Sequence, residues 1–379
     1  MSAKVTRYKL FKTQGEFLFG VPKDKLNQDE VYIDVSLYQG GVTCVPADTE
    51  YLSPTGWKRI ESLTTDNELA IYHSNGTISF EKPLKVFQYE ADTWYNFDTR
   101  FVKQKLCPAH KIVYFAENDR EMLHPKKVSC EDYVKGGCNQ HFKIRNYFKS
   151  GNNGNSGLSE IELRLAVAYQ ADGYNYIRAH KHINPTYLVG FHLKKQNKID
   201  RLLNLLNESG INYKHTIRKN GIKKGYSDIL FRLDKIKDLK HFPSEWYSLN
   251  DKELQIIFDE VKHWDRATKN KKDGSVGTTT YYTNSKQDRD FIQFVCASQG
   301  FCTTTYERTR DIKIEYKNKE YKYNNKREYS VSWTKGKPLG LGKAKEVKAK
   351  GGEAKYCPLT TTGMWLARYK NYIFVTGNS

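Results

Sequence analysis

The chain has 379 residues, seven cysteines at scattered spacing and a formal net charge of +19, which predicts two or three domains and favours a polyanionic partner, above all nucleic acid. No apolar run approaches the roughly 18 residues of a membrane-spanning helix, and the first residues carry no secretory segment, so we expect no membrane partner. The odd cysteine count argues against a disulfide scaffold and predicts a cytoplasmic protein with free thiols.

Turn residues and low-complexity stretches divide the chain. Residues 1–43 end in VYIDVSLYQGGVT, which predicts a strand running into a Gly-Gly turn. Residues 44–148 contain short apolar and β-branched runs such as ELAIYH and KIVYF, and are expected to be mostly β. The run KSGNNGNSG at 149–157 predicts a flexible connector, and KGKPLGLGKAKEVKAKGGEAK at 335–355 leads into a short β-rich tail. Because both ends of the middle part are linkers, we expect one domain inserted into another.

Two helices of the middle part each deliver an aspartate at the same place. SEIELRLAVAYQADG opens with a capping box of Ser159 and Glu162, and Asp172 lies three turns below the first apolar position on the same stripe. NDKELQIIFDEVKHWD opens at Asn250 and places Asp265 at the same spacing. If these helices pack together, the two carboxylates converge and can share Mg²⁺ ions over a scissile phosphate.

The first of these helices resembles the nonapeptide of LAGLIDADG homing endonucleases. LAVAYQADG matches that motif at Leu165, Ala166, Ala171, Asp172 and Gly173. The second copy, FDEVKHWDR, keeps only Asp265 and has Arg266 in place of the glycine. Each aspartate is followed, 35–40 residues later, by a glycine that closes another helix, Gly210 or Gly300. The resemblance implies a monomeric α/β domain of two repeats whose saddle-shaped sheets bind double-stranded DNA.

The ends of the remaining chain carry groups suited to the excision of a polypeptide segment. The Cys44 thiol can take over the upstream acyl group, and the Ser379 hydroxyl can then accept it. The Asn378 side-chain amide can attack its own carbonyl and release the segment. Residues 44–378 would leave, and residues 1–43 would be joined to Ser379.

Three stretches resemble the sequence blocks of an intein, a member of the Hint superfamily: CVPADTEYLSPTGWKRI, LCPAHKIVYF and the terminal Asn-Ser pair. The resemblance implies a horseshoe-shaped, discontinuous, mostly β splicing domain formed by residues 44–148 and 346–378, with the endonuclease and its linkers at 149–345. It implies no cofactor for splicing. It also assigns His110 the protonation of the departing Cys44 nitrogen.

Four positions depart from the intein pattern. Cys107 stands where threonine is usual, and Gly377 replaces the usual histidine before the terminal asparagine. Cys357 occupies an aspartate position and Met364 a histidine position. The ending VTGNS resembles a known variant, so the sequence indicates an altered site. We expect Cys357 to act there as an acid, a base or a hydrogen-bonding group.

The flanks of the segment suggest what it interrupts. Joined, they read VYIDVSLYQGGVT-S, and a downstream Gly-Lys-Ser/Thr would complete a phosphate-binding loop. This junction resembles the ATPase motif of a phage terminase large subunit. Two alternatives stay open. The first alternative is a DNA-binding nuclease in which Cys44 and Asn378 are incidental. The second alternative is an intein that cleaves its junctions without ligation, and Gly377 favours this one.

Overall fold

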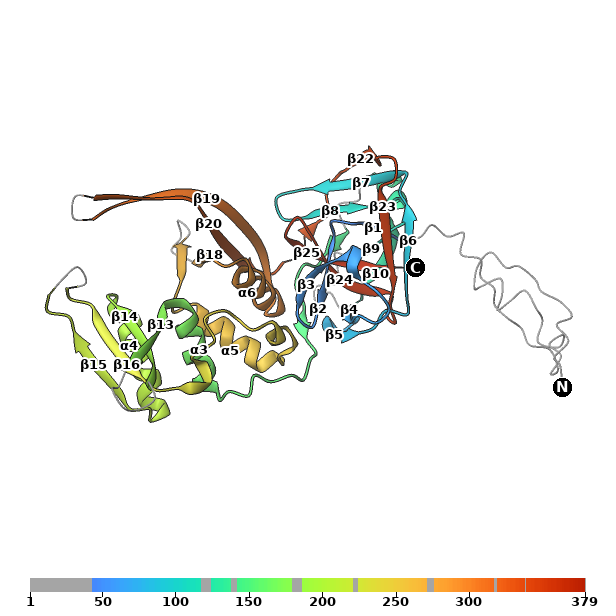
Figure 1. The fold of residues 1–379 in the computed structure, drawn as a ribbon. Coiled ribbons are helices and arrows are strands. Elements are labelled where there is room, and N and C mark those ends of the chain that lie inside the picture. The colour runs from blue at the N-terminus through green and yellow to red at the C-terminus, as the bar shows by residue number, and fades with distance from the viewer. Residues whose placement is uncertain are drawn as a thin grey trace, which may run out of the picture.

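The described chain forms two bodies that lie side by side, one built from its two ends and one from its middle (Figure 1). The computed structural model describes residues 43–116, 124–137, 142–178, 186–220, 224–270, 276–316, 319–337 and 339–378. No helix within these ranges is long and apolar enough to cross a bilayer.

The first body, here called the β body, contains strands from both ends of the chain. Its N-terminal elements are β1 (Val45–Pro46), β2 (Glu50–Ser53), β3 (Gly56–Arg59), η2 (Ile60–Ser62), β4 (Leu69–Tyr72), β5 (Thr77–Glu81), β6 (Lys85–Glu90), β7 (Thr93–Asp98), β8 (Lys103–Leu106), β9 (Lys111–Tyr114), β10 (Lys126–Ser129), α2 (Cys130–Lys135), β11 (Lys143–Ile144) and β12 (Lys149–Ser150). Its C-terminal elements are β21 (Leu339–Gly340), β22 (Ala344–Lys348), β23 (Ala354–Leu359), β24 (Met364–Tyr369) and β25 (Tyr372–Gly377).

The two sets of strands interleave. In the largest sheet the order is β10-β9-β25-β24-β4-β5-β12, so the C-terminal hairpin lies between two N-terminal strands. Strand β23 lies between β1 and β6 in a second sheet. Neither chain segment can complete these sheets alone. The expected discontinuous, mostly β domain is therefore confirmed.

The borders of the β body differ from the expected ones. The predicted flexible connector begins as strand β12, which pairs in parallel with β5, so that prediction was wrong for residues 149–150. At the other border, β21 pairs with β11 and β22 with β7, so the C-terminal part begins at Leu339 and not at residue 346. Strand β22 is largely exposed. An exposed strand does not need alternating apolar and polar residues, so the sequence carries no pattern that would predict it.

The second body, here called the inserted body, consists of two repeats. The first contains α3 (Glu160–Asp172), β13 (Gly173–Arg178), β14 (Thr186–Leu193), α4 (Gln196–Ser209), β15 (Tyr213–Ile217) and β16 (Ser227–Phe231), followed by η3 (Asp234–Ile236) and η4 (Ser244–Ser248). The second contains α5 (Asp251–Val261), β17 (Arg266–Asn270), β18 (Val276–Thr283), α6 (Lys286–Ser298), β19 (Phe301–Tyr316) and β20 (Lys319–Lys335). Their sheets have matching strand orders, β13-β14-β16-β15 and β17-β18-β20-β19. The expected α/β two-repeat domain is confirmed.

Local signals set the helices that position the aspartates. At the start of α3, the Ser159 hydroxyl accepts a hydrogen bond from the Glu162 backbone amide. The Glu162 carboxylate accepts one from the Ser159 backbone amide, as a capping box requires. Asn250 caps α5 by accepting the Glu253 amide at 3.0 Å. Helices α3 and α5 pack against each other inside one apolar core. Their C-terminal ends therefore meet.

A buried ion-pair network joins the two bodies. Arg368 in β24 is only 1% exposed, and its guanidinium bonds both carboxylate oxygens of Glu50 in β2. The same guanidinium donates to Asp290 of α6 at 2.9 Å and to Gln293 at 3.2 Å. Gln293 in turn donates to the carbonyl of Asn371, in the turn between β24 and β25, at 2.7 Å. Helix α6 thus holds the hairpin that ends at residue 377.

Candidate functional sites

Three buried thiols meet at the start of the β body. The Cys44 amide donates a hydrogen bond to the Cys107 sulfur at 3.1 Å. The Thr43 hydroxyl and the Cys357 thiol share a hydrogen bond of 3.2 Å. Cys107 follows β8, and Cys357 lies in β23, which pairs antiparallel with β1. Three distant chain segments therefore surround the Thr43–Cys44 peptide.

The thiols change one another's acidity. The Cys107 and Cys357 thiols, together with burial, raise the pKa of Cys44 far above its usual value. The contact with the Cys44 thiol lowers the pKa of Cys107 to about 7 and also lowers that of Cys357. Negative charge in this cluster is thus favoured on Cys107 and Cys357. Cys44 needs a neighbouring base before it can act as a thiolate nucleophile.

His110 connects the two ends of the β body. The imidazole is fully buried, and its Nε2 forms a hydrogen bond with the hydroxyl of Thr376, two residues before Asn378. Burial lowers the pKa of His110 to about 3, an effect partly offset by the backbone of Cys44 and Thr43. The ring is therefore neutral at physiological pH and lies at the peptide where the sequence predicted its action. Its Nδ1 has no hydrogen-bond partner among the described residues.

Asn378 is buried at the end of the β24–β25 hairpin. Its amide nitrogen donates to the carbonyl of Gly363 at 2.9 Å. Its side-chain Nδ2 donates to the carbonyl of Pro358 at 2.5 Å and to the Thr360 hydroxyl at 3.4 Å. The ammonium of Lys127 donates to the Asn378 backbone carbonyl at 3.2 Å. The side-chain amide and the backbone carbonyl of Asn378 are thus each held by a neighbour.

The other predicted residues of this site are placed only in part. Gly377 pairs with Met364 across the hairpin, and Met364 is buried in the apolar core. Ser379 and residues 1–42, which include nearly all of the expected upstream host segment, lie outside the described residues.

A second site lies where the two repeats of the inserted body meet. Asp172 is the last residue of α3, and Asp265 follows α5. The ammonium of Lys198 contacts both, at 2.5 Å from Asp172 Oδ2 and 3.2 Å from Asp265 Oδ1. One ammonium can touch both carboxylates only if they converge. Burial and the nearby Asp172 charge raise the pKa of Asp265, as expected for two carboxylates crowded together.

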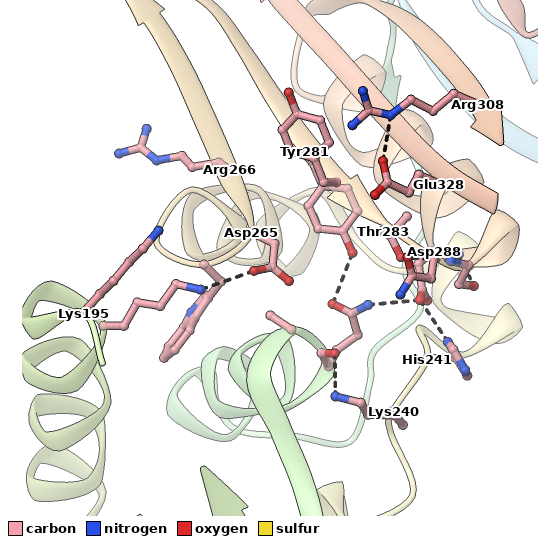
Figure 2. A pocket seen from close by; sticks show the side chains of 17 residues that line it. Lys195, Lys240, His241, Asp265, Arg266, Tyr281, Thr283, Asp288, Arg308 and Glu328 are labelled. Atoms are coloured by element: carbon pink, nitrogen blue, oxygen red, sulfur yellow. Dashed lines mark hydrogen bonds and ion pairs between the residues drawn. The ribbon is translucent and has the colours of Figure 1, made fainter. Parts of the chain in front are cut away.

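A pocket of about 610 Å³ opens beside Asp265. Figure 2 shows the basic side chains of Lys195, Lys240 and Arg266 around Asp265. A phosphodiester entering this pocket would meet cations on several sides and the carboxylate of Asp265 in its wall.

Lys240 also stabilises the helix that carries Asp172. Its ammonium donates to the carbonyls of Tyr169, Gln170 and Gly173, at 3.1, 3.0 and 2.7 Å. These carbonyls form the C-terminal end of α3, where the helix dipole favours a cation. Lys240 therefore fixes the position of the first aspartate.

The carboxylate pair suits a divalent cation. Within the described residues, no group of three or more Asp, Glu, His or Cys side chains is arranged as a metal cluster. Mg²⁺ commonly binds through one or two carboxylates and completes its shell with phosphate oxygens and water. The Lys198 ammonium, bridging the pair, shows that a cation is stabilised between Asp172 and Asp265.

Three lysines were missed by the reasoning from sequence: Lys127, Lys198 and Lys240. Each lies in a polar stretch with other lysines or polar residues nearby, so no spacing marks it out. The residues that they contact are separated from them by 26 to 251 positions along the sequence, so only the folded chain reveals these contacts.

Comparison with known proteins gives structural similarity alone. No protein-family model matches the sequence, and a search of curated proteins finds no match. Among solved structures, the chain is similar to a splice-inactive variant of the AceL NrdHF class 3 split intein, with 9% identity and a TM-score of 0.33 over 89% of this chain and 98% of that one. It is also similar to I-DmoI bound to its target DNA in the presence of magnesium, with 14% identity and a TM-score of 0.31 over 48% of this chain and 92% of that one. Mesophilic variants of the homing endonuclease I-DmoI give 13% identity and a TM-score of 0.30 over 46% of this chain and 88% of theirs. At such identities and TM-scores the similarity does not decide function.

Proposed function

We propose that the chain is a self-splicing intein precursor. The observation that carries this proposal is the meeting of both junctions at consecutive residues of β23. Thr43 contacts Cys357, and the Asn378 side chain contacts Pro358. If the two junctions were incidental, as in a DNA-binding nuclease without splicing activity, nothing would require them to meet in one buried place.

The first step is an N-to-S acyl shift at the Thr43–Cys44 peptide. The Cys107 thiolate, which the contact with the Cys44 thiol favours, accepts the Cys44 proton, and the Cys44 sulfur attacks the Thr43 carbonyl carbon. The proton then passes from Cys107 through the neutral His110 ring to the Cys44 nitrogen as the C–N bond breaks, which leaves a thioester and a free amine. Cys107 holds the peptide by accepting the Cys44 amide hydrogen bond.

The later steps transfer the acyl chain and release the segment. The Ser379 hydroxyl attacks the thioester carbonyl, which forms an ester and restores the Cys44 thiol. Asn378 Nδ2 then attacks its own backbone carbonyl, so that a succinimide forms and Ser379 leaves with a free amino group. An O-to-N shift converts the ester into a peptide bond between Thr43 and Ser379.

Expression with one tag before residue 1 and another beyond Ser379 tests this proposal. Splicing predicts a single short product that carries both tags. Two separate products, each with one tag, would instead support cleavage without ligation. Only the full-length chain in all samples would contradict the proposal.

We propose a second function for the inserted body, the cleavage of double-stranded DNA at a specific site by a monomer. The convergence of Asp172 and Asp265 beside a basic pocket supports it. Bound Mg²⁺ would neutralise phosphate charge and activate water. Asp172 and Asp265 would hold the ions, and Lys195 and Arg266 would bind backbone phosphates. Incubating the purified chain and Mg²⁺ with a plasmid that carries the uninterrupted junction sequence tests it: linear DNA is expected, and an intact plasmid would contradict it.

The interrupted host is proposed from the flanking sequence alone. Joining residues 1–43 to Ser379 would place the junction within a phosphate-binding loop similar to that of a phage terminase large subunit. The six cysteines within the described ranges form no disulfide among themselves, which suits splicing in a reducing cytoplasm.

A further inference from the structure

The Asn378 carbonyl needs a partner that Gly377 cannot supply. Cyclisation of Asn378 moves an electron pair onto this oxygen, so a donor aimed at it lowers the barrier. Gly377 has no side chain to donate. A Cβ at that position would lie 3.0 Å from the Lys111 carbonyl and 3.2 Å from Val113, so a larger residue there would crowd β9. With glycine at this position, the donor has to come from another part of the fold.

Lys127 occupies the place from which such a donor must act. Strand β10 pairs with β9, and β9 pairs with β25, so the sheet carries Lys127 to the end of the hairpin. The Lys127 ammonium donates to the Asn378 carbonyl oxygen at 3.2 Å. In the described part of the chain no carboxylate forms an ion pair with Lys127, so its charge is available to this oxygen.

A glycine makes room for the contact. Gly363, in the turn before β24, has a φ of +66°, and its carbonyl accepts the Asn378 amide. A Cβ at Gly363 would lie 2.3 Å from Lys127 Nζ and 3.1 Å from Asn378 Oδ1. The turn therefore has the one residue type that tolerates both this backbone conformation and the close approach of the lysine.

On the basis of the splicing function proposed above, we propose that Lys127 is a catalytic residue that stabilises the oxyanion of Asn378 cyclisation. Asn378 Nδ2 forms a bond to the Asn378 carbonyl carbon, and the carbonyl electron pair moves onto the oxygen facing Lys127. The oxyanion then collapses and the bond to the Ser379 nitrogen breaks. That nitrogen receives the proton lost by Nδ2, and the Lys127 ammonium is unchanged at the end.

The electrostatic surroundings of Lys127 fit this role. Part of the side chain is exposed, yet burial of its end and the nearby Lys111 charge lower the pKa of Lys127. A less hydrated ammonium gains more from a developing negative charge. The rate of cyclisation should therefore fall as pH rises through the lowered pKa of Lys127. An arginine at this position should keep the rate flat over the same range.

The test measures the reactions at the two junctions separately, in a chain that carries a tag beyond Ser379. Release of the tag from a Cys44→Ala background reports Asn378 cyclisation alone. Dithiothreitol-induced cleavage in an Asn378→Ala background reports the Thr43–Cys44 thioester alone. Each is measured with Lys127→Met, with Lys127→Arg and with Lys126→Met, a matched exposed lysine on the same strand.

Lys127→Met is expected to slow tag release by roughly 10²-fold, the usual loss of one oxyanion donor, while thioester cleavage stays unchanged. Lys127→Arg should recover most of the rate, and Lys126→Met should behave like the parent. Tag release by Lys127→Met at the parent rate would overturn the inference, and so would equal loss at both junctions. Failure of the parent chain at both junctions would instead overturn the splicing function itself.

Discussion

The Thr43 hydroxyl lies 3.2 Å from the Cys357 thiol, and this contact ties the residue before the first junction to the strand that also holds Asn378. The two reactions proposed at Cys44 and Asn378 would thus share one support, β23. A disturbance of this strand is expected to affect both junctions, whereas changes to single side chains should affect one.

Replacing Cys357 with alanine tests the role of that contact. The variant removes the hydrogen bond to Thr43 and the thiol that faces Cys44. We expect dithiothreitol-induced cleavage at the Thr43–Cys44 thioester to slow by about tenfold or more. Cys296→Ala, which removes a buried thiol of α6 outside this site, is the matched control. Equal rates in the two variants would show that Cys357 only fills space.

The buried imidazole of His110 predicts how stability depends on pH. Its folded pKa of about 3 lies below the unfolded value near 6.5, so the unfolded chain binds a proton that the folded chain does not. Stability is therefore unaffected by this group above about pH 6.5, and is lost as pH falls towards 3. The limiting slope is about 1.4 kcal/mol per pH unit. Urea unfolding of the parent chain and of His110→Gln between pH 7 and 4 should show a shallower fall for the variant. Parallel curves would contradict a neutral, buried His110.

Arg368 should be a main determinant of the contact between the two bodies. Arg368→Met leaves the carboxylates of Glu50 and Asp290 without their shared partner, and breaking such a buried pair costs about 3–5 kcal/mol. We expect a lower midpoint in denaturant and slower cyclisation at Asn378, because the hairpin that carries it loses its anchor. The control is Arg232→Met, whose pair with Asp234 is exposed and should leave the midpoint unchanged. A parent-like midpoint for Arg368→Met would contradict the role assigned to this network.

DNA cleavage and splicing should separate cleanly. Asp172→Asn or Asp265→Asn should lower DNA cleavage by about 10²-fold or more, because each removes half of the carboxylate pair, while splicing continues at the parent rate. Asp200→Asn, on the exposed face of α4, is the control. Chelation of divalent cations with EDTA should likewise stop cleavage and spare splicing. If a variant that combines Asp172→Asn and Asp265→Asn cleaved DNA at the parent rate, the nuclease site would lie elsewhere.

Much of this architecture was predictable because local signals agreed with the fold. The capping residues Ser159 and Asn250 begin the helices where expected, and the equal spacing places Asp172 and Asp265 at matching ends. The second repeat was recognisable from its helices despite Arg266, and the sheet orders now show that repeat directly.

The rest depends on contacts that no local pattern encodes. Strand β22 pairs with β7, but its side chains are largely exposed and show no alternation of apolar and polar residues, so the sequence of β22 resembles a linker. The burial of Arg368 is possible only because carboxylates from two distant segments surround it. Lys127 and Lys198 are ordinary lysines until the fold places them beside Asn378 and the aspartate pair.

The most direct test of the account is the intact mass of the chain expressed with a short tag beyond Ser379, compared with its Cys44→Ala form. Splicing predicts two products: residues 44–378 with a mass lowered by succinimide formation at Asn378, and residues 1–43 joined to Ser379 and the tag. Cys44→Ala should lack the joined product. An unprocessed mass in both forms would contradict splicing and leave the DNA-binding nuclease as the remaining function.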